Sequence, residues 1–460
     1  MSSNTSLLFY LVFIATLGPL QFGFHLGELN AAQPSIVHDI PMDASRWGLV
    51  QSSFTIGGLL GALLGGPLAT KYGRLFGMRL LTAALFLGPV AEALAQTIST
   101  LTLGRFVSGT GAGAATVICP VYVAEVAPLA QRGLFGAFTQ VMINLGIVIA
   151  QLLGYFLGGD QRWRYILGTA ALIAIVTWLG LLTAPETPKW LAENNRPRMA
   201  KGVLQSVRGH DSDIRGEMAG WDWSGEAEEE SLLGPPRGPR PPKEPTKSFL
   251  DVLRIPKYRK ALIGVTACMM AQQLCGINSV VMYSVAILGS IMPLYAALVT
   301  VVVSTVNVVV TLACAPLADK IGRKPCLLLS AFGMGINSML LAIGLSQHIP
   351  TLTIIALILF VCSFAVGLGP VPFILASELA GPEAVGAISS WALAGCWLSM
   401  FSVAQFFPIL NAAVPRGQVY WIFTGIALFF GIFIAWWVPE SRGKETPEEI
   451  WGTIDEEEQA

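Results

Sequence analysis

The chain has 460 residues, of which 53% are hydrophobic and 12% are charged, and its formal net charge is −1. Soluble globular proteins carry roughly 25% charged residues, so this chain has too few charges to cover a surface that faces water. The charges are also unevenly placed, because residues 189–260 hold 14 of the 28 basic and 11 of the 29 acidic residues. The composition therefore excludes a soluble enzyme, a disordered chain and a nucleic-acid-binding protein.

A membrane-spanning helix needs ~20 mostly apolar residues, and the sequence contains twelve runs of this kind. The first run has no basic segment before it and no small-residue cleavage site after it, so we interpret it as a retained span rather than a signal peptide. The predicted spans cover residues 7–27, 47–69, 76–97, 101–124, 134–157, 165–184, 261–288, 293–316, 326–346, 351–377, 386–410 and 419–438.

The runs form two groups of six on either side of a polar insert. We therefore predict an all-α membrane protein with twelve transmembrane helices in two six-helix halves. Within the insert, an acidic stretch from Gly225 and a proline-rich linker from Gly234 to Pro245 precede an amphipathic lead-in to span seven. Such a linker is typical of a segment without packed structure. The predicted domains are residues 1–184 (first half), 185–260 (cytoplasmic insert), 261–438 (second half) and 439–460 (cytoplasmic tail).

The basic residues predict the orientation, since cytoplasmic loops are enriched in Lys and Arg. The insert, both termini and the loops after spans two, four and eight together hold 23 of the 28 basic residues, while the opposite side holds four. We therefore expect the insert and both termini to face the cytoplasm.

The seven cysteines lie in or at the ends of apolar runs, without the paired spacing of a disulfide framework or a zinc site. The stretch Gly109–Ala114 fits a dinucleotide-binding pattern, but it lies inside a predicted span, whereas that pattern needs a preceding strand. We find no nucleophile–base pair either. The sequence therefore predicts no cofactor, no metal and no enzymatic activity.

Two motifs recur at corresponding places in the halves. Gly66-Pro-Leu-Ala-Thr-Lys-Tyr-Gly-Arg74 follows span two and Ala315-Pro-Leu-Ala-Asp-Lys-Ile-Gly-Arg-Lys324 follows span eight. Pro185-Glu-Thr-Pro188 closes span six and Pro439-Glu-Ser-Arg-Gly-Lys444 closes span twelve. Parallel repeats are typical of transporters that bind their substrate between the halves near the bilayer midplane.

Further motifs occur in the same order as in sugar porters: Gln21-Phe-Gly-Phe-His-Leu-Gly-Glu-Leu-Asn30, Gly104-Arg105, Pro120-Val-Tyr-Val-Ala-Glu125 and Gln272-Gln-Leu-Cys-Gly-Ile-Asn278. The chain therefore resembles the sugar porter family of the major facilitator superfamily over nearly its whole length. The resemblance implies the facilitator fold, transport by alternating access, and a monosaccharide (a hexose or a related polyol) as the small-molecule partner.

Several amides lie inside the apolar spans. Because amides both donate and accept hydrogen bonds, they match sugar hydroxyls, but they also hold helices together in lipid. The residues alone leave both readings open. Cys275-Gly276 would allow a break in span seven that brings its amides together. The resemblance implies sugar contacts for Gln140, Gln272, Gln273, Asn278 and Asn307, and not for Gln151.

Span ten contains four helix-breaking residues that a gate, or a merely kinked helix, would use: Gly367, Gly369, Pro370 and Pro372. The resemblance implies that Phe373 and Trp391 contact the sugar ring. The family's usual carboxylate and tryptophan are replaced by Ala365 and Phe373, which puts a preference for glucose in doubt.

Energy coupling has two interpretations. Proton-coupled relatives carry an aspartate where His25 stands, and a histidine could titrate near an acidic lumen. Glu28, one turn on, and Glu92 in span three are the nearby intramembrane carboxylates. We favour passive uniport, with His25 as a neutral hydrogen-bonding residue, and keep proton coupling through His25 and Glu28 as the alternative.

The resemblance also implies a cytoplasmic charge network that clamps the outward-facing state as the halves rock. Thr70 and Glu383 depart from the family pattern, so we expect a weaker clamp. The network residues are Arg74, Arg105, Glu125 and Arg132 in the first half, with Asp319, Arg323 and Glu378 in the second.

The segment Glu228-Glu-Glu-Ser-Leu232-Leu233 resembles an acidic dileucine sorting signal that would engage a sorting adaptor. We therefore expect a vacuolar or endolysosomal membrane, with the plasma membrane as the alternative, and a monomer. A non-transporting sugar sensor is the less favoured alternative, because a sensor of the same fold would carry a long signalling tail, whereas about twenty residues follow Pro439.

Overall fold

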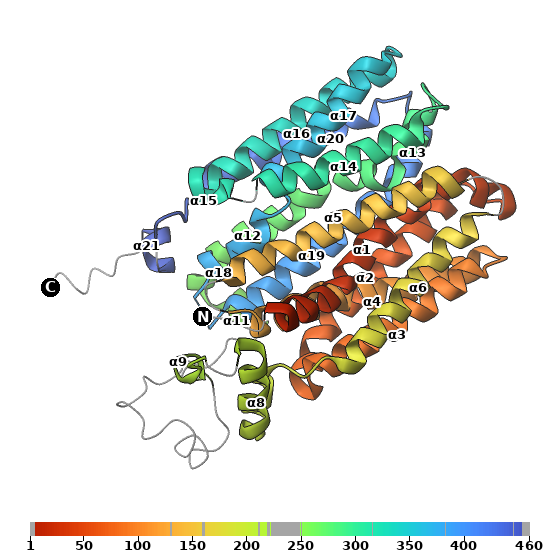
Figure 1. Cartoon of the computed structure of the whole chain (residues 1–460). Helices are drawn as coiled ribbons and strands as arrows, with labels where there is room; N and C mark the ends of the chain where they lie inside the picture. Colours follow the sequence, from red (N-terminus) through yellow and green to blue (C-terminus); the bar gives the residue numbers. More distant parts are fainter. Residues whose placement is uncertain are drawn as a thin grey trace.

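The computed structural model describes residues 5–128, 131–158, 162–209, 212–218, 221, 249, 251–314, 316–381, 383–444 and 446–452. The described elements are all helices, and the long ones run side by side as a bundle (Figure 1). Twelve of the described helical stretches are long and apolar enough to cross a membrane. The predicted all-α fold with twelve spans is thus confirmed.

The spans of the first half are α1 to α6, and those of the second half begin with α12. Two spans of the second half each consist of two helices, α12 with α13 and α17 with α18. The bounds are α1 Thr5–Asp39, α2 Ala44–Tyr72, α3 Arg74–Ala93, α4 Ile98–Val126, α5 Arg132–Leu157, α6 Trp163–Thr183, α12 Pro256–Leu274, α13 Ile277–Gly289, α14 Ala296–Cys314, α16 Arg323–Ser346, α17 Pro350–Val366, α18 Val371–Leu379, α19 Val385–Ala413 and α20 Val419–Trp437.

Short helices connect and flank these spans: α7 Pro188–Glu193, α8 Pro197–Arg208, α9 Arg215–Met218, α11 Asp251–Arg254, α15 Leu317–Ile321 and α21 Pro447–Trp451. The insert helices α8 and α9 lie at the same end of the bundle as the start of α1 and as α21 (Figure 1). We call this end the insert end and the opposite one the far end.

The first span is longer than the sequence predicted, since α1 continues twelve residues beyond residue 27, to Asp39. Leu29, Ala32 and Ile36 are fully buried along this extension. Their spacing of three and four residues gives one apolar face of a helix. Packing of this face continues the helix through a segment whose average hydropathy is too low to be recognised as a span.

Both predicted breaks are present. In span seven, α12 ends at Leu274 and α13 begins at Ile277, with Gly276 at φ +100° between them. In span ten, α17 ends at Val366 and α18 begins at Val371. Glycine adopts a positive φ at little cost, and proline lacks the N–H that a continuous helix needs. These residues therefore interrupt the spans in the middle of the bundle.

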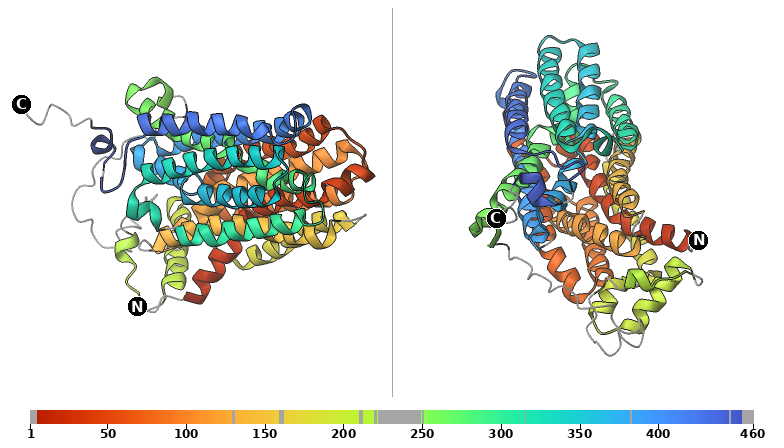
Figure 2. Two further views of the ribbon diagram at one scale, coloured as in Figure 1. Left: turned by 90° about the horizontal axis from the view of Figure 1, so that it is seen from above. Right: turned by 90° about the vertical axis from the view of Figure 1, so that its left-hand side faces the viewer.

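Each half forms a compact group of helices, and the two groups face each other (Figure 2). They pack together through α2 against α19, α5 against α14 and α1 against α13. Hydrogen bonds join the halves from the middle of the bundle to the far end: Asn30 binds Ser284, Gln405 binds Ser52, and Gln151 binds the Val281 carbonyl. The far end is therefore closed.

The insert has a small apolar core of its own beside the first half, formed by Trp190, Leu191, Leu204, Met218 and others. It is tied to the bundle by two hydrogen bonds to backbone carbonyls: Trp190 Nε1 donates to Thr70, and Arg208 Nη1 donates to Val126. The predicted sorting residues Glu228, Leu232 and Leu233 lie outside the described residues.

Candidate functional site

Three amides meet at the break in span seven. Gln273 Nε2 donates to Gln272 Oε1 at 2.9 Å, and Asn278 Nδ2 donates to Gln273 Oε1. Gln272 and Asn278 are buried, whereas Gln273 is partly exposed. A continuous helix would point residues 272 and 278 in different directions, so the turn at Gly276 is what brings the amides together.

Gln272 also joins the two broken spans. Its Nε2 donates to the carbonyl oxygens of Leu368 and Gly369, each at 2.8 Å. These carbonyls lie in the break between α17 and α18, where they lack partners within a helix. Gln272 thus links the backbone of span ten to the amide cluster in span seven.

A second polar chain crosses between the halves. Gln140 Nε2 donates to Asn144 Oδ1, Asn144 Nδ2 donates to Thr311 Oγ1 at 2.9 Å, and Thr311 Oγ1 donates to Asn307 Oδ1. The structure thus brings the predicted residues Gln140 and Asn307 into one network. The sequence reasoning missed Asn144 and Thr311, although each follows a predicted residue by four positions, the spacing that places side chains on one face of a helix.

The two aromatic residues lie differently from the amides. Phe373 is 48% exposed on α18. The ring of Trp391 stacks on Phe249 at 4.2 Å between centroids, and its Nε1 donates to the Phe249 carbonyl at 2.8 Å. In this conformation Trp391 is therefore held by the end of the insert.

Arg105 requires a correction. The sequence placed it in the cytoplasmic network, but it precedes Glu125 by twenty residues on α4, ~30 Å along a helix axis. Its Nη1 donates to Glu28 Oε1 at 2.6 Å, and the same oxygen contacts His25 Nδ1 at 2.6 Å. All three side chains are fully buried within the first half. Because burial of one charge demands a partner, Arg105 faces Glu28 rather than the loops.

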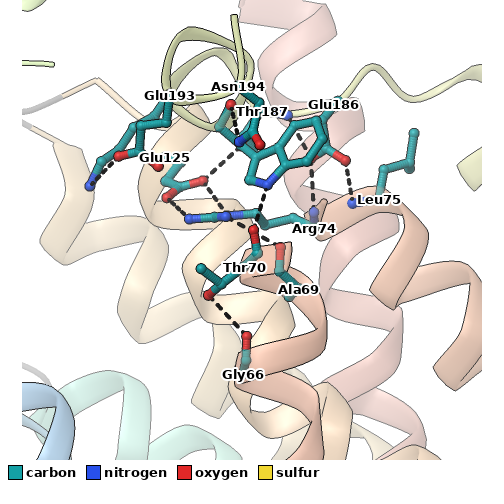
Figure 3. Close-up of polar contacts among 12 residues, drawn as sticks. Gly66, Ala69, Thr70, Arg74, Leu75, Glu125, Glu186, Thr187, Glu193 and Asn194 are labelled. Carbon is teal, nitrogen blue, oxygen red and sulfur yellow. Dashed lines mark hydrogen bonds and ion pairs between the residues drawn. The ribbon is translucent and has the colours of Figure 1, made fainter. Parts of the chain in front are cut away.

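The insert end carries a network around Arg74 (Figure 3). Arg74 forms two hydrogen bonds to the Glu125 carboxylate, at 2.8 and 2.9 Å, and Thr187 Oγ1 donates to Glu125. The Glu186 carboxylate accepts from the backbone N–H groups of Arg74 and Leu75 and so caps α3. Burial raises the pKa of Glu186 above its ordinary value, although these N–H groups oppose the shift.

The second half repeats this arrangement. Arg323 binds Glu378 at 2.8 Å and Asp319 at 3.0 Å, and Glu440 accepts from the backbone N–H groups of Arg323 and Lys324. These ion pairs each stay within one half. Nothing is described of the Arg132 side chain, although its backbone begins α5.

A groove of about 680 Å³ runs between α2, α3 and α4. Gly61, Leu64, Leu80, Leu87 and Ile118 are among its mostly apolar lining residues. It lies wholly on the first half and offers few groups that could bind hydroxyls. The amide networks between the halves, rather than this groove, are the candidate site for a polar ligand.

Twelve spans in two packed halves, broken helices and buried amides between the halves define a membrane transporter of the major facilitator fold. Residues 11–450 match the family model described as "Sugar (and other) transporter". The chain belongs to the sugar porter family of the major facilitator superfamily. It is a multi-pass membrane protein and a sugar transporter rather than an enzyme.

Relatives and solved structures agree with this assignment. The chain is 31% identical to the Staphylococcus epidermidis glucose transporter GlcP, covering 95% of this chain and 96% of the relative. It is also 31% identical to vacuolar protein sorting-associated protein 73 of Saccharomyces cerevisiae, covering 95% and 94%. The partially occluded inward-open structure of the E. coli xylose transporter XylE superposes with a TM-score of 0.80 at 25% identity, covering 96% of this chain and all of that one.

Proposed function

We propose that the protein transports a monosaccharide, a hexose or a related polyol, as a facilitative uniporter. The observation that carries this proposal is the pair of amide networks at the broken spans and between the halves. Gln140, Gln272, Gln273, Asn278 and Asn307 would bind the hydroxyls, and Phe373 and Trp391 would contact the ring. The names of GlcP and XylE support a sugar of this size.

In this proposal the halves rock around the sugar. Contacts from both halves are complete only when the site is closed, so the bound sugar favours closure. Gly367, Gly369, Pro370 and Pro372 allow span ten to bend and gate the site. The separate ion pairs of Arg74 and Arg323 support an inward-facing state, in which a clamp between the halves would be open.

Counterflow in proteoliposomes tests this proposal. Labelled glucose, fructose and a polyol are followed with and without an imposed proton gradient. Equilibration without accumulation is the expected result. If the folded protein transported none of these sugars, the proposal of monosaccharide transport would be wrong.

Proton-coupled transport is the second candidate, and the buried contact of His25 and Glu28 with Arg105 favours it. In that case a proton gradient would drive sugar accumulation. Replacement of His25 and Glu28 together would abolish the accumulation while leaving sugar exchange at equilibrium. Accumulation that survives the replacement would exclude this pair as the coupling site.

We further propose that the insert and both termini are cytoplasmic, and that a monomer resides in a vacuolar or endolysosomal membrane. The basic residues support the orientation, and the name of the yeast vacuolar sorting-associated relative supports the location. Replacing Leu232 and Leu233 by alanine should redirect a fluorescent fusion to the plasma membrane. An unchanged location would exclude the dileucine segment as the signal.

A further inference from the structure

The first half encloses a polar cluster that the sugar site does not use. It combines side chains from four helices, all with an exposed fraction of zero: His25 and Glu28 from α1, Gln51 from α2, Glu92 from α3 and Arg105 from α4. Ligand atoms of His25, Glu28 and Glu92 lie within 4.8 Å of one another. Such a cluster deep in a membrane protein is costly unless its charges balance.

The cluster has two carboxylates but a single permanent cation. Arg105 Nη1 lies 2.6 Å from Glu28 Oε1 and 3.8 Å from Glu92 Oε2. Glu28 also contacts His25 Nδ1, so Glu28 is the counterion of Arg105. With His25 neutral, an ionised Glu92 would then be a second buried negative charge without a matching cation, which is strongly unfavourable.

Unpartnered polar atoms point to the same deficit. Among the described residues, His25 Nε2, Glu28 Oε2, Glu92 Oε2 and Arg105 Nε are buried without a hydrogen-bond partner. Glu92 Oε1 already accepts from Ser108 Oγ, so Oε2 is the free position. Buried polar atoms are almost always satisfied. Glu28 Oε2 and Glu92 Oε2 are acceptors without a donor, and a proton on Glu92 Oε2 supplies one, whereas Arg105 Nε is an N–H donor that a cation would not satisfy.

A proton fits this position better than a metal ion. A divalent cation would lie against the Arg105 guanidinium and would give the cluster a net positive charge with His25 neutral. One proton on Glu92 instead leaves Glu28 and Arg105 as a balanced pair. The groups on the other packed elements do not change this count: α2 contributes the uncharged Gln51, and Arg164 of α6 binds the backbone carbonyls of Ala93 and Ala95.

The cluster is linked to the closed far end. Glu28 precedes Asn30 by two residues on α1. The Asn30 side chain donates to the Val281 carbonyl and to Ser284 Oγ, and it accepts from the Val285 N–H on α13 of the other half. Glu28 and the hydrogen bonds of Asn30 that join the halves thus lie within one turn of the same helix.

We propose that Glu92 binds a proton that exchanges with the far side, and that this proton controls closure of the far end. The further step, that the proton thereby controls transport, rests on the proposed sugar transport. With the proton on Glu92 Oε2, Arg105 pairs with Glu28 alone and α1 holds the far end closed. Without it, the ionised Glu92 competes for Arg105, Glu28 loses its counterion, and the contacts of Asn30 weaken. Acidity on the far side thereby regulates the porter.

Infrared difference spectra of the full-length protein in lipid nanodiscs test proton binding without any sugar. Acidification should produce the carbonyl band of a protonated carboxylic acid. The band should be absent in Glu92→Gln and displaced in Ser108→Ala, which removes only the hydrogen bond to Oε1. Glu378→Gln, at the insert end, should retain it. A wild-type spectrum in Glu92→Gln, or a band displaced by sodium instead of changing with pH, would overturn the proposal.

Sugar exchange in proteoliposomes tests the control of transport. Wild-type exchange should slow as the far side is acidified. Exchange by Glu92→Gln, whose side chain is uncharged like a protonated carboxyl group, should be slow at every pH of the far side. Identical pH profiles for the wild type and Glu92→Gln would overturn the proposed regulation of transport by Glu92. Absence of wild-type exchange at every pH would contradict the proposed transport, whereas the infrared titration would still report on Glu92. Should Glu92→Gln fail to fold, the displaced band of Ser108→Ala decides the assignment.

Discussion

At the scale of single residues, neighbouring amides have different tasks. Gln272 donates to the backbone carbonyls of Leu368 and Gly369. Within the described part of the chain, the side chain of Gln273 instead forms its hydrogen bonds with side chains of its own half. Hydrogen bonds to the backbone of a broken span position that span. Those between side chains can be exchanged for bonds to a ligand.

These different roles of Gln272 and Gln273 predict different effects of substitution by alanine. Gln272→Ala leaves two buried carbonyls without a donor, so we expect a loss of about 1–3 kcal/mol in stability and a lower thermal midpoint. Gln273→Ala and Asn278→Ala should fold with a midpoint close to that of the wild type and lose most counterflow. Full counterflow in both of the latter would show that the amide cluster is not the sugar site.

Glu186 predicts a pH dependence of stability. Its pKa is raised above the ordinary value of 4.5 mainly by burial. The folded protein therefore binds more protons than the unfolded chain between the two pKa values. This contribution to stability is complete below the ordinary pKa and is lost as the pH rises through the raised one. As the pH rises through this window, the thermal midpoint should fall in the wild type and fall less in Glu186→Gln. Glu193→Gln, in the same insert, should keep the wild-type slope.

At the scale of elements, the breaks in spans seven and ten determine where the polar groups lie. The break in span seven depends on the positive φ of Gly276, and a Cβ there would lie 2.8 Å from the ring of Phe423. Both the backbone conformation and the close approach of α20 therefore require glycine. The break in span ten is then held by Gln272, so the two broken elements form one unit.

Gly276→Ala tests this unit. A left-handed conformation costs an L-residue about 1–2 kcal/mol, and the contact with Phe423 adds to this cost. We expect a lower thermal midpoint and a loss of counterflow. Gly289→Ala is the matched control, because Gly289 lies on the second part of the same span and a Cβ built there has no neighbouring heavy atom within 4 Å. Equal behaviour of the two variants would contradict a requirement for glycine at the break.

At the scale of the whole molecule, the closed far end is the feature that defines the conformation. There α2 and α19 approach so closely that a Cβ on Gly48 would lie 2.5 Å from the Gln405 carbonyl oxygen. The hydrogen bonds of Asn30 and Gln405 reinforce this closure. Alternating access requires that these contacts separate and re-form in each cycle.

Gly48→Trp should therefore act as a wedge. The indole cannot fit between α2 and α19, so the far end stays open and counterflow is lost, while sugar binding measured by calorimetry remains. Gly168→Trp on α6 is the control, since no heavy atom lies within 4 Å of a Cβ there, and it should transport like the wild type. Normal transport by Gly48→Trp would exclude closure of α2 against α19 from the cycle.

The sequence by itself determined the twelve spans, the two halves and the breaks at Cys275-Gly276 and Gly367–Pro370. These are local properties, because about twenty apolar residues specify a span and glycine or proline specifies an interruption. The start of span seven at Pro256 and the end of α1 at Asp39 were less predictable, since the polar residues in these turns lower the average hydropathy.

Only the tertiary structure decided which faces of the helices meet. The pairing of Arg105 with Glu28, the chain from Gln140 through Asn144 and Thr311 to Asn307, and the contact of Trp391 with Phe249 join residues far apart in sequence. Such pairings depend on the rotation and depth of each helix within the bundle. Packing of small residues against neighbouring backbones sets both, and hydrophobic spans of similar composition do not encode them locally.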